Sequence, residues 1–96
     1  MDIACDHGTP IVAADSGTVI YSGWMGGYGY AVMIDHGGGL VSLYGHNQEL
    51  AVSEGQYVNK GQVISYAGST GWSTGPHCHF EVRIHGEVTE PLDYLP

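Results

Sequence analysis

Short apolar runs separated by turn residues make up most of this chain. No stretch of eleven or more residues carries apolar side chains at helical spacing without an interrupting Gly or Pro. The runs are rich in Val, Ile, Tyr or Phe and are bounded by Gly, Asp, Asn or Ser, as is typical of strands. The pattern predicts an all-β fold with strands at residues 11–14, 17–22, 30–35, 40–46, 62–67 and 79–84.

Turn residues and a weak internal repeat indicate how these strands are connected. The segment from Asp35 to Gly39 is rich in residues that tolerate positive φ, so it predicts a hairpin that pairs 30–35 with 40–46 in antiparallel fashion. The segments 8–20 and 55–64 both read as Gly-x-x-apolar followed by Gly-x-Val-Ile. We therefore expect a duplicated β-unit.

Length and charge limit the classes of function. Ninety-six residues form one domain with one hydrophobic core. No run approaches the roughly 18 consecutive apolar residues of a membrane span. The net charge is −8 and only Lys60 and Arg83 are basic, which disfavours binding to nucleic acids or anionic membranes. The first residues carry no features of a secretory signal peptide.

The segment from His77 to Ile84 carries the strongest chemical pattern. Successive side chains of a strand point to opposite faces, so Cys78, Phe80, Val82 and Ile84 are expected to face the core. The opposite face then holds His77, His79, Glu81 and Arg83. Two imidazoles on one face suit a metal ligand beside a proton-transfer group, although a solvated strand face is the simpler alternative.

The remaining histidines are divided between one candidate and three turn residues. His46 ends the strand at 40–46, where alternation places it with Ser42 and Tyr44 on the face opposite Val41 and Leu43. A capped turn histidine is the alternative for His46. His7, His36 and His85 each stand beside turn residues and are expected to have no catalytic role.

Several motifs occur in order along nearly the whole chain, and together they resemble the lysostaphin-like zinc metallopeptidases, which cut peptide cross-links of bacterial cell walls. An ordered set of motifs is far more specific than any one of them. The resemblance implies a duplicated, mostly antiparallel β-fold of the sandwich or half-barrel kind. The motifs are Asp2-Ile3-Ala4, Gly8-Thr9-Pro10, Tyr44-Gly45-His46, the segment 55–61, Gly68-Ser69-Thr70-Gly71, Gly75-Pro76-His77-Cys78-His79-Phe80-Glu81 and Pro91-Leu92-Asp93-Tyr94-Leu95.

The same resemblance implies the roles of four residues. Asp2 and His79 resemble the zinc ligands of the family, His77 its general base, and His46 the group that stabilises the developing oxyanion. Zinc would lower the pKa of a bound water to about 7, His77 would take the proton, and His46 would donate a hydrogen bond. The implied partner is a peptidoglycan peptide. The resemblance also implies a monomer that has no membrane span and acts in the cell envelope or outside the cell.

One family feature falls outside the sequence. The family's first zinc ligand is a His four residues before the Asp, which would precede Met1, so residues 1–96 are expected to form a single catalytic domain that lacks its N-terminal edge. With Asp2 and His79 alone, zinc should bind weakly or not at all. A catalytically inactive relative that binds the cell wall or activates another wall hydrolase is the alternative. A lipoyl-like carrier is disfavoured, because Lys60 lies inside the second repeat unit.

Two cysteines and two aromatic residues complete the set of candidates. Cys5 and Cys78 should both face away from the metal side, close enough across the sheet for a disulfide. A pair of buried reduced thiols is the equal alternative. Trp72 and Tyr28 stand in glycine-rich turns and are expected to wall a peptide groove, unless they only pack within their loops.

Overall fold

The computed structural model describes residues 2–4, 6–69, 77–85 and 87–89, and within these ranges it contains strands, one 3-10 turn and no α-helix. The predicted all-β class is confirmed. No helix in these ranges is long and apolar enough to cross a membrane. The elements are β1 (Asp2–Ala4), β2 (Pro10–Val12), β3 (Gly17–Trp24), η1 (Gly26–Tyr28), β4 (Tyr30–Gly37), β5 (Leu40–Leu50), β6 (Tyr57–Val58), β7 (Val63–Ala67), β8 (His77–Ile84) and β9 (Glu87–Thr89).

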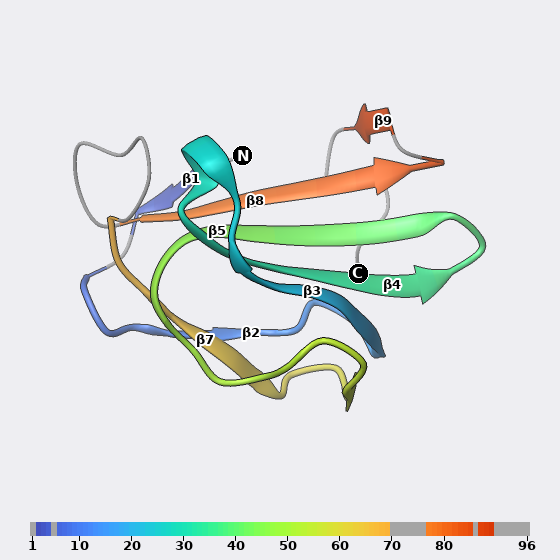
Figure 1. Ribbon diagram of the computed structural model, residues 1–96, viewed down its shortest axis with the longest axis horizontal. Coiled ribbons are helices and arrows are strands. Elements are labelled where there is room, and N and C mark those ends of the chain that lie inside the picture. The colour runs from blue at the N-terminus through green and yellow to red at the C-terminus, as the bar shows by residue number, and fades with distance from the viewer. Residues whose placement is uncertain (1, 5, 70–76, 86, 90–96) are drawn as a thin grey trace.

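All strand pairs are antiparallel, and the longest strand joins two parts of the sheet. The main order is β1-β8-β5-β4-β3-β6, while β7 pairs with both β2 and β5 and β9 pairs with β8. The first part of β5 lies between β4 and β8, and its end pairs with β7. In Figure 1 this strand bends out of the upper layer toward β2 and β7, which produces the half-barrel shape.

The hydrophobic core fills the space between these two parts. Its members come from the upper strands and from the lower strands and loops, and almost all of them are fully buried. Burying one such Val or Ile stabilises the fold by about 1.5–3 kcal/mol relative to leaving it exposed. The core residues are Ala13, Val19, Val32, Ile34, Tyr44, Val52, Val58, Ile64, Phe80 and Val82.

Six strands lie where the sequence predicts them, and the hairpin between β4 and β5 is confirmed by positive φ at Gly37, Gly38 and Gly39. Three strands, β1, β6 and β9, were not predicted, because two or three residues carry no periodic signal. The predicted repeat units pair with each other, β2 with β7 and β3 with β6.

The sequence divides β5 into two faces, and the structure shows which of them meets the core. Tyr44 packs on Phe80 in the core, with ring centroids 5.2 Å apart, so the face that carries Ser42 and Tyr44 is the core face. The two hydroxyl oxygens lie 2.9 Å apart, and the Tyr44 hydroxyl also accepts a hydrogen bond from the Ala14 amide at 3.0 Å. Buried hydroxyls are tolerated here because they are hydrogen-bonded.

His36 supports this polar network. It belongs to β4 and is partly buried, which corrects the prediction of a turn residue. Its Nδ1 atom lies 2.8 Å from the Ser16 carbonyl oxygen and its Nε2 atom 2.7 Å from the Ser42 hydroxyl. Because both ring nitrogens have partners within the fold, His36 has a structural role in this network.

Candidate active site

A pocket of about 350 Å³ lies where the η1 turn covers β5 and β8. It is lined by Gly27, Tyr28, His46 and His79. Three of these residues were candidates from the sequence, and the fold brings them together from positions far apart in the chain. The pocket is therefore the candidate active site.

His79 reaches the pocket from β8, whose predicted alternation is confirmed for the residues with described side chains. Phe80 and Val82 lie in the core, whereas His79 and Glu81 interact on the opposite face. The β1–β8 register places Asp2 directly opposite His79, and the β5–β8 register places Gly45 opposite it on the other side. The backbone thus aligns the two predicted zinc ligands across adjacent strands.

His46 reaches the same pocket by breaking the alternation of β5. A regular strand would place His46 on the core face with Tyr44, but its backbone has φ of 61°, in the left-handed region. Its ring centroid lies 5.8 Å from that of His79 with the planes 68° apart, and only 6% of the residue is exposed. Residues held in this conformation cluster at functional sites.

Asn47 stabilises the irregular backbone at His46. It is fully buried, and its Nδ2 atom donates to the carbonyl oxygens of Tyr44 at 3.0 Å and Tyr30 at 2.9 Å. The Gly68 amide donates to the carbonyl oxygen of His46 at 3.1 Å. These bonds replace regular ladder bonds at the point where the β5 register shifts.

Tyr28 forms one wall of the pocket. Its ring centroid lies 5.3 Å from that of His79, with the planes tilted by 37°. The ring lies close to β5: a Cβ added at Gly45 would be 3.4 Å from Tyr28 Cβ and Cδ1, an ordinary van der Waals contact. The prediction that Tyr28 lines a groove is thus consistent with its place in the pocket.

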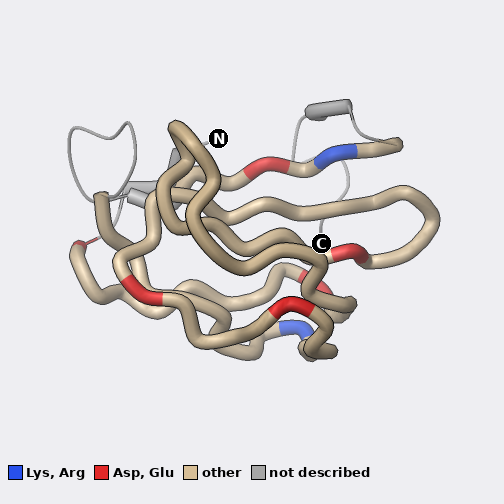
Figure 2. The backbone as a smooth tube through the Cα atoms, in the orientation of Figure 1, with Lys and Arg blue, Asp and Glu red and all other residues tan. Residues whose placement is uncertain are grey.

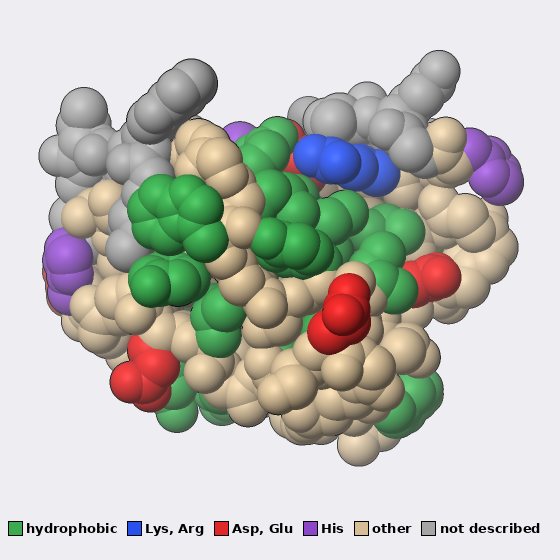
Figure 3. All heavy atoms as spheres, viewed as in Figure 1, with side chains coloured by type: hydrophobic (Ala, Val, Ile, Leu, Met, Phe, Trp, Pro, Cys, Tyr) green, Lys and Arg blue, Asp and Glu red, His purple; other side chains and the backbone are tan. Residues whose placement is uncertain are grey.

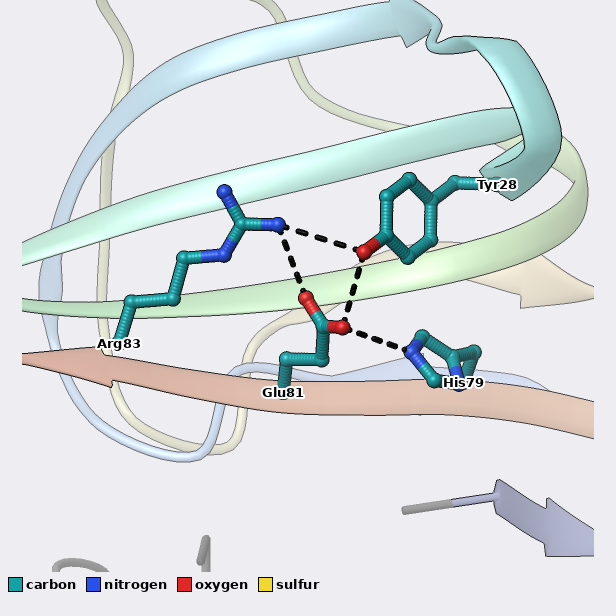
Figure 4. Close-up of polar contacts among 4 residues, drawn as sticks. All are labelled: Tyr28, His79, Glu81 and Arg83. Carbon is teal, nitrogen blue, oxygen red and sulfur yellow. Dashed lines mark hydrogen bonds and ion pairs between the residues drawn. The ribbon is translucent and has the colours of Figure 1, made fainter. Parts of the chain in front are cut away.

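A buried carboxylate links the two walls of the pocket (Figure 4). Oε1 of Glu81 accepts hydrogen bonds from the Tyr28 hydroxyl at 2.9 Å and from Nε2 of His79 at 3.0 Å. Its Oε2 accepts from Nη2 of Arg83 at 3.0 Å, and the same Arg83 nitrogen donates to the Tyr28 hydroxyl at 3.4 Å. The sequence pattern placed Glu81 and Arg83 on the histidine face but gave them no role.

Electrostatics at this carboxylate favour its ionised form. Burial would raise the pKa of Glu81, but the hydrogen bonds from His79, Tyr28 and Arg83 outweigh burial and hold that pKa below its ordinary value. Burial, together with the neighbouring Glu81, raises the pKa of Tyr28. At neutral pH the carboxylate therefore accepts and the phenol donates.

Several predicted site residues lie beyond what the structure describes. The backbone positions of Asp2 and His77 on β1 and β8 are defined, but their side chains, and that of Cys78, lie outside the described part. Cys5 and Trp72 lie outside the described residues altogether, so the disulfide and the role of Trp72 stay predictions. Among the described residues no group of three or more His, Cys, Asp or Glu could hold a metal ion.

Charged residues are few and spread over the molecule. Figure 2 shows the acidic and basic residues scattered along the chain, and on β8 Glu81 and Arg83 form an ion pair. Hydrophobic side chains gather on the face seen in Figure 3. Trp24 is 53% and Tyr30 40% exposed, and their rings form an edge-on pair with centroids 5.2 Å apart at the two ends of the η1 connection.

Comparison with known proteins identifies the family. The family model described as "Peptidase family M23" matches residues 1–91. The chain belongs to peptidase family M23.

Curated relatives include peptidases and activators. The chain is 46% identical to "DD-carboxypeptidase/endopeptidase Mpg" of Neisseria meningitidis in an alignment that covers 96% of this chain. It is 48% identical to "Lipoprotein NlpD/LppB homolog" of Pseudomonas aeruginosa in an alignment that covers 100% of this chain. The identity is 41% over 99% of the chain with "Murein hydrolase activator EnvC" of Escherichia coli. The chain spans 21%, 32% and 23% of the lengths of these three relatives.

Solved structures share the fold. The catalytic domain of lysostaphin from Staphylococcus simulans matches with a TM-score of 0.91 and 32% identity, over 97% of this chain and 74% of that one. A zinc-containing peptidase from Vibrio cholerae matches with a TM-score of 0.88 and 35% identity, over 92% of this chain and 27% of that one. The predicted lysostaphin-like family and half-barrel fold are confirmed.

Proposed function

We propose that this chain is the catalytic domain of a zinc-dependent endopeptidase that hydrolyses peptide cross-links of bacterial peptidoglycan. The observation that carries the proposal is the contact of His46 with His79 in one pocket, with Asp2 opposite His79 in the β-ladder. One histidine from β5 and one from β8 meet in this pocket, and β1 brings the backbone of Asp2 beside β8. The family and the fold support this chemistry.

Asp2 and His79 are the residues that would hold the zinc ion. A carboxylate and an imidazole are both zinc ligands, and positions directly opposite in an antiparallel ladder lie on one face of the sheet. The family pattern supplies a third ligand, a His four residues before Asp2. When bound, zinc polarises the scissile carbonyl and lowers the pKa of water toward neutrality.

His77 and His46 would supply the proton transfer and the oxyanion stabilisation. His77 is two residues before His79 on β8, so we expect it on the same face from strand periodicity, where it would take a proton from the attacking water. His46, nearly buried and held by its irregular backbone, would donate a hydrogen bond to the oxygen on which negative charge develops. A preorganised donor of this kind contributes most where water is excluded.

The peptide would bind along the η1 connection. Tyr28 walls the pocket, and the exposed pair Trp24 and Tyr30 flanks the turn that carries it. Aromatic surfaces on loops are typical of peptide-binding sites. A substrate of this kind places the protein in the cell envelope or outside the cell, and we expect it to act as a monomer.

Activation of another wall hydrolase is the second candidate function. The similarity to a murein hydrolase activator favours it. The presence of Asp2, His46, His77 and His79 favours an enzyme instead, because an activator has no need of zinc ligands or a proton acceptor.

The two functions are separated by an assay of the chain, extended to place a His four residues before Asp2, on purified peptidoglycan with and without a second wall hydrolase. An endopeptidase releases new amino termini by itself, and His77→Ala abolishes the release while His7→Ala, at an exposed histidine outside the pocket, leaves it unchanged. Stimulation of the second hydrolase without release by the chain alone, unaltered in His77→Ala, would establish the activator and overturn the proposal.

A further inference from the structure

A second pocket lies at the opposite end of β4 from the candidate active site. Its volume is about 340 Å³, and it forms where β6 and the start of β3 meet the end of β4. Its described lining residues include Thr18, Asp35, His36 and Tyr57, and no Lys or Arg is among them. The proposed peptidase chemistry uses none of these residues.

Three of the lining residues form one row across the outer face of the sheet. Thr18 is directly opposite Asp35 in the β3–β4 ladder and directly opposite Tyr57 in the β3–β6 ladder. The neighbouring pair, Val19 and Ile34, lies in the core, so alternation places this row on the outer face. All three residues are exposed, Tyr57 to 61%. The small Thr18 side chain therefore leaves room between a carboxylate and an aromatic ring.

One oxygen of the Asp35 carboxylate is open to a ligand. Oδ1 accepts a hydrogen bond from the Gly37 amide at 2.9 Å, and the structure describes no residue that pairs with Oδ2. Arg83 lies in the same row beyond Val41, but its guanidinium is paired with Glu81 at 3.0 Å. With a net charge of −8, the chain as a whole also attracts cations. The described part of the chain thus offers a cation an uncompensated carboxylate in a pocket.

The walls of this pocket are fixed before any ligand binds. Nδ1 of His36 lies 2.8 Å from the Ser16 carbonyl oxygen and Nε2 lies 2.7 Å from the Ser42 hydroxyl, so the ring is held on both sides. The Gly37 amide likewise holds Asp35 within the hairpin. A site that is already ordered loses less conformational freedom when it binds a ligand.

We propose that this pocket binds a primary ammonium group carried by a peptide, between Asp35 and Tyr57. The ammonium group would lie over Thr18, where Oδ2 of Asp35 and the Thr18 hydroxyl accept its hydrogens. Opposite residues lie about 5 Å apart, so the Tyr57 ring is within the roughly 6 Å over which an aromatic face attracts a cation. A calcium or magnesium ion is a poorer fit, because it requires about six oxygen ligands.

The pocket opens on the same face of the sheet as the candidate active site. His79 and Arg83 are four residues apart on that face of β8, Val41 is opposite Arg83, and the next strand brings Asp35 opposite Val41. Four residues of strand measure about 13 Å and two strand spacings about 10 Å, which places Asp35 roughly 16 Å from His79. A peptide of about five extended residues spans that distance. In a further step, which rests on the proposed function, the ammonium group would belong to the substrate, about five residues from the scissile bond.

The binding step is tested by NMR titration of the chain with N-acetyl-lysine methylamide and with its norleucine analogue, which has the same carbon chain without the amine. We expect saturable shifts of the Thr18, Gly37 and Tyr57 amides with the lysine compound only. Asp35→Asn keeps the oxygen that holds Gly37 and should weaken binding about two- to fivefold, as should Tyr57→Leu. Glu49→Gln, which removes the same charge from an exposed position of β5, should leave binding unchanged.

Two results would overturn the ammonium site. Equal shifts with the norleucine analogue or with a neutral disaccharide of N-acetylglucosamine would assign the pocket a different ligand chemistry. Lysine binding that is unchanged in a folded Asp35→Asn chain would remove the carboxylate from the site. Neither measurement involves zinc or cleavage, so both are independent of the proposed function.

The substrate step is tested separately, on the chain extended to place a His four residues before Asp2. Peptides with a free amine about five residues from the scissile bond should be cleaved about two- to fivefold faster than the same peptides with that amine acetylated. The preference should disappear in Asp35→Asn. Equal cleavage of the two peptides would overturn the substrate step, whereas no cleavage of either would overturn the proposed function itself.

Discussion

His46 meets His79 in the pocket, with ring centroids 5.8 Å apart, although the residue two positions earlier, Tyr44, lies in the core. A strand that alternates regularly would have placed both on the same face. The positive φ of 61° at His46 redirects its side chain. The site therefore depends on one irregular backbone position within the longest strand.

Removal of the His46 imidazole should slow turnover strongly without removing the metal. If His46 stabilises the oxyanion, His46→Ala lowers kcat about 10²- to 10³-fold, the range found when one such donor is lost. Zinc content, measured in the same samples, should be unchanged because His46 is not a proposed ligand. Loss of zinc together with activity would instead make His46 a ligand.

The positive φ at His46 predicts that a Gly variant is more stable than an Ala variant at this position, the reverse of the usual order in a strand. His46→Gly should be more stable than His46→Ala by about 1 kcal/mol, because Gly accepts positive φ without steric cost. At Glu49, an exposed position of the same strand, the order should reverse, with Gly less stable than Ala by about 0.5–1 kcal/mol. Urea denaturation measures both pairs, and the same order at both positions would contradict a strained His46.

The core hydroxyl network should contribute to folding rather than to catalysis. Tyr44→Phe keeps the ring contact with Phe80 but leaves the Ala14 amide without its acceptor, at a cost of about 1–3 kcal/mol. Tyr57→Phe, at a residue that is 61% exposed, should change stability by less than about 0.5 kcal/mol. Equal stability of the two variants would show that the Tyr44 hydroxyl and its hydrogen bonds do not stabilise the fold.

In a chain extended to place a His four residues before Asp2, zinc should stabilise the fold through His79, because Asp2 and His79 alone should bind zinc weakly. A ligand that binds only the native state at a hundredfold excess over its Kd adds about 2.7 kcal/mol, so a chelator should lower Tm and zinc should restore it. The His79→Ala variant should show no such response, whereas His7→Ala should respond as the wild type does. A zinc-dependent Tm shift of full size in His79→Ala would place the metal elsewhere.

The regular parts of the molecule could be predicted from the sequence and the irregular parts could not. The faces of β8 followed from alternation because that strand is continuous, and both Phe80 and His79 lie as expected. For β5, alternation separated the two faces but did not show that Ser42 and Tyr44 are on the core face, where hydrogen bonds accommodate their hydroxyl groups. Polarity alone does not identify the core side of this strand.

The role of Glu81 was also beyond the sequence pattern. Alternation grouped it with His79 and Arg83, which was correct, but its third partner Tyr28 comes from η1, more than fifty residues away. Contacts of this kind depend on how a loop folds over the sheet. Strand periodicity carries no information about them.

The most direct measurement is the zinc content of the chain, determined alongside its release of amino termini from purified peptidoglycan, with the N-terminus extended to place a His four residues before Asp2. A metallopeptidase should hold one zinc ion per chain and cleave, and both properties should be lost in His79→Ala. A folded extended chain that neither binds zinc nor cleaves would contradict the proposed function.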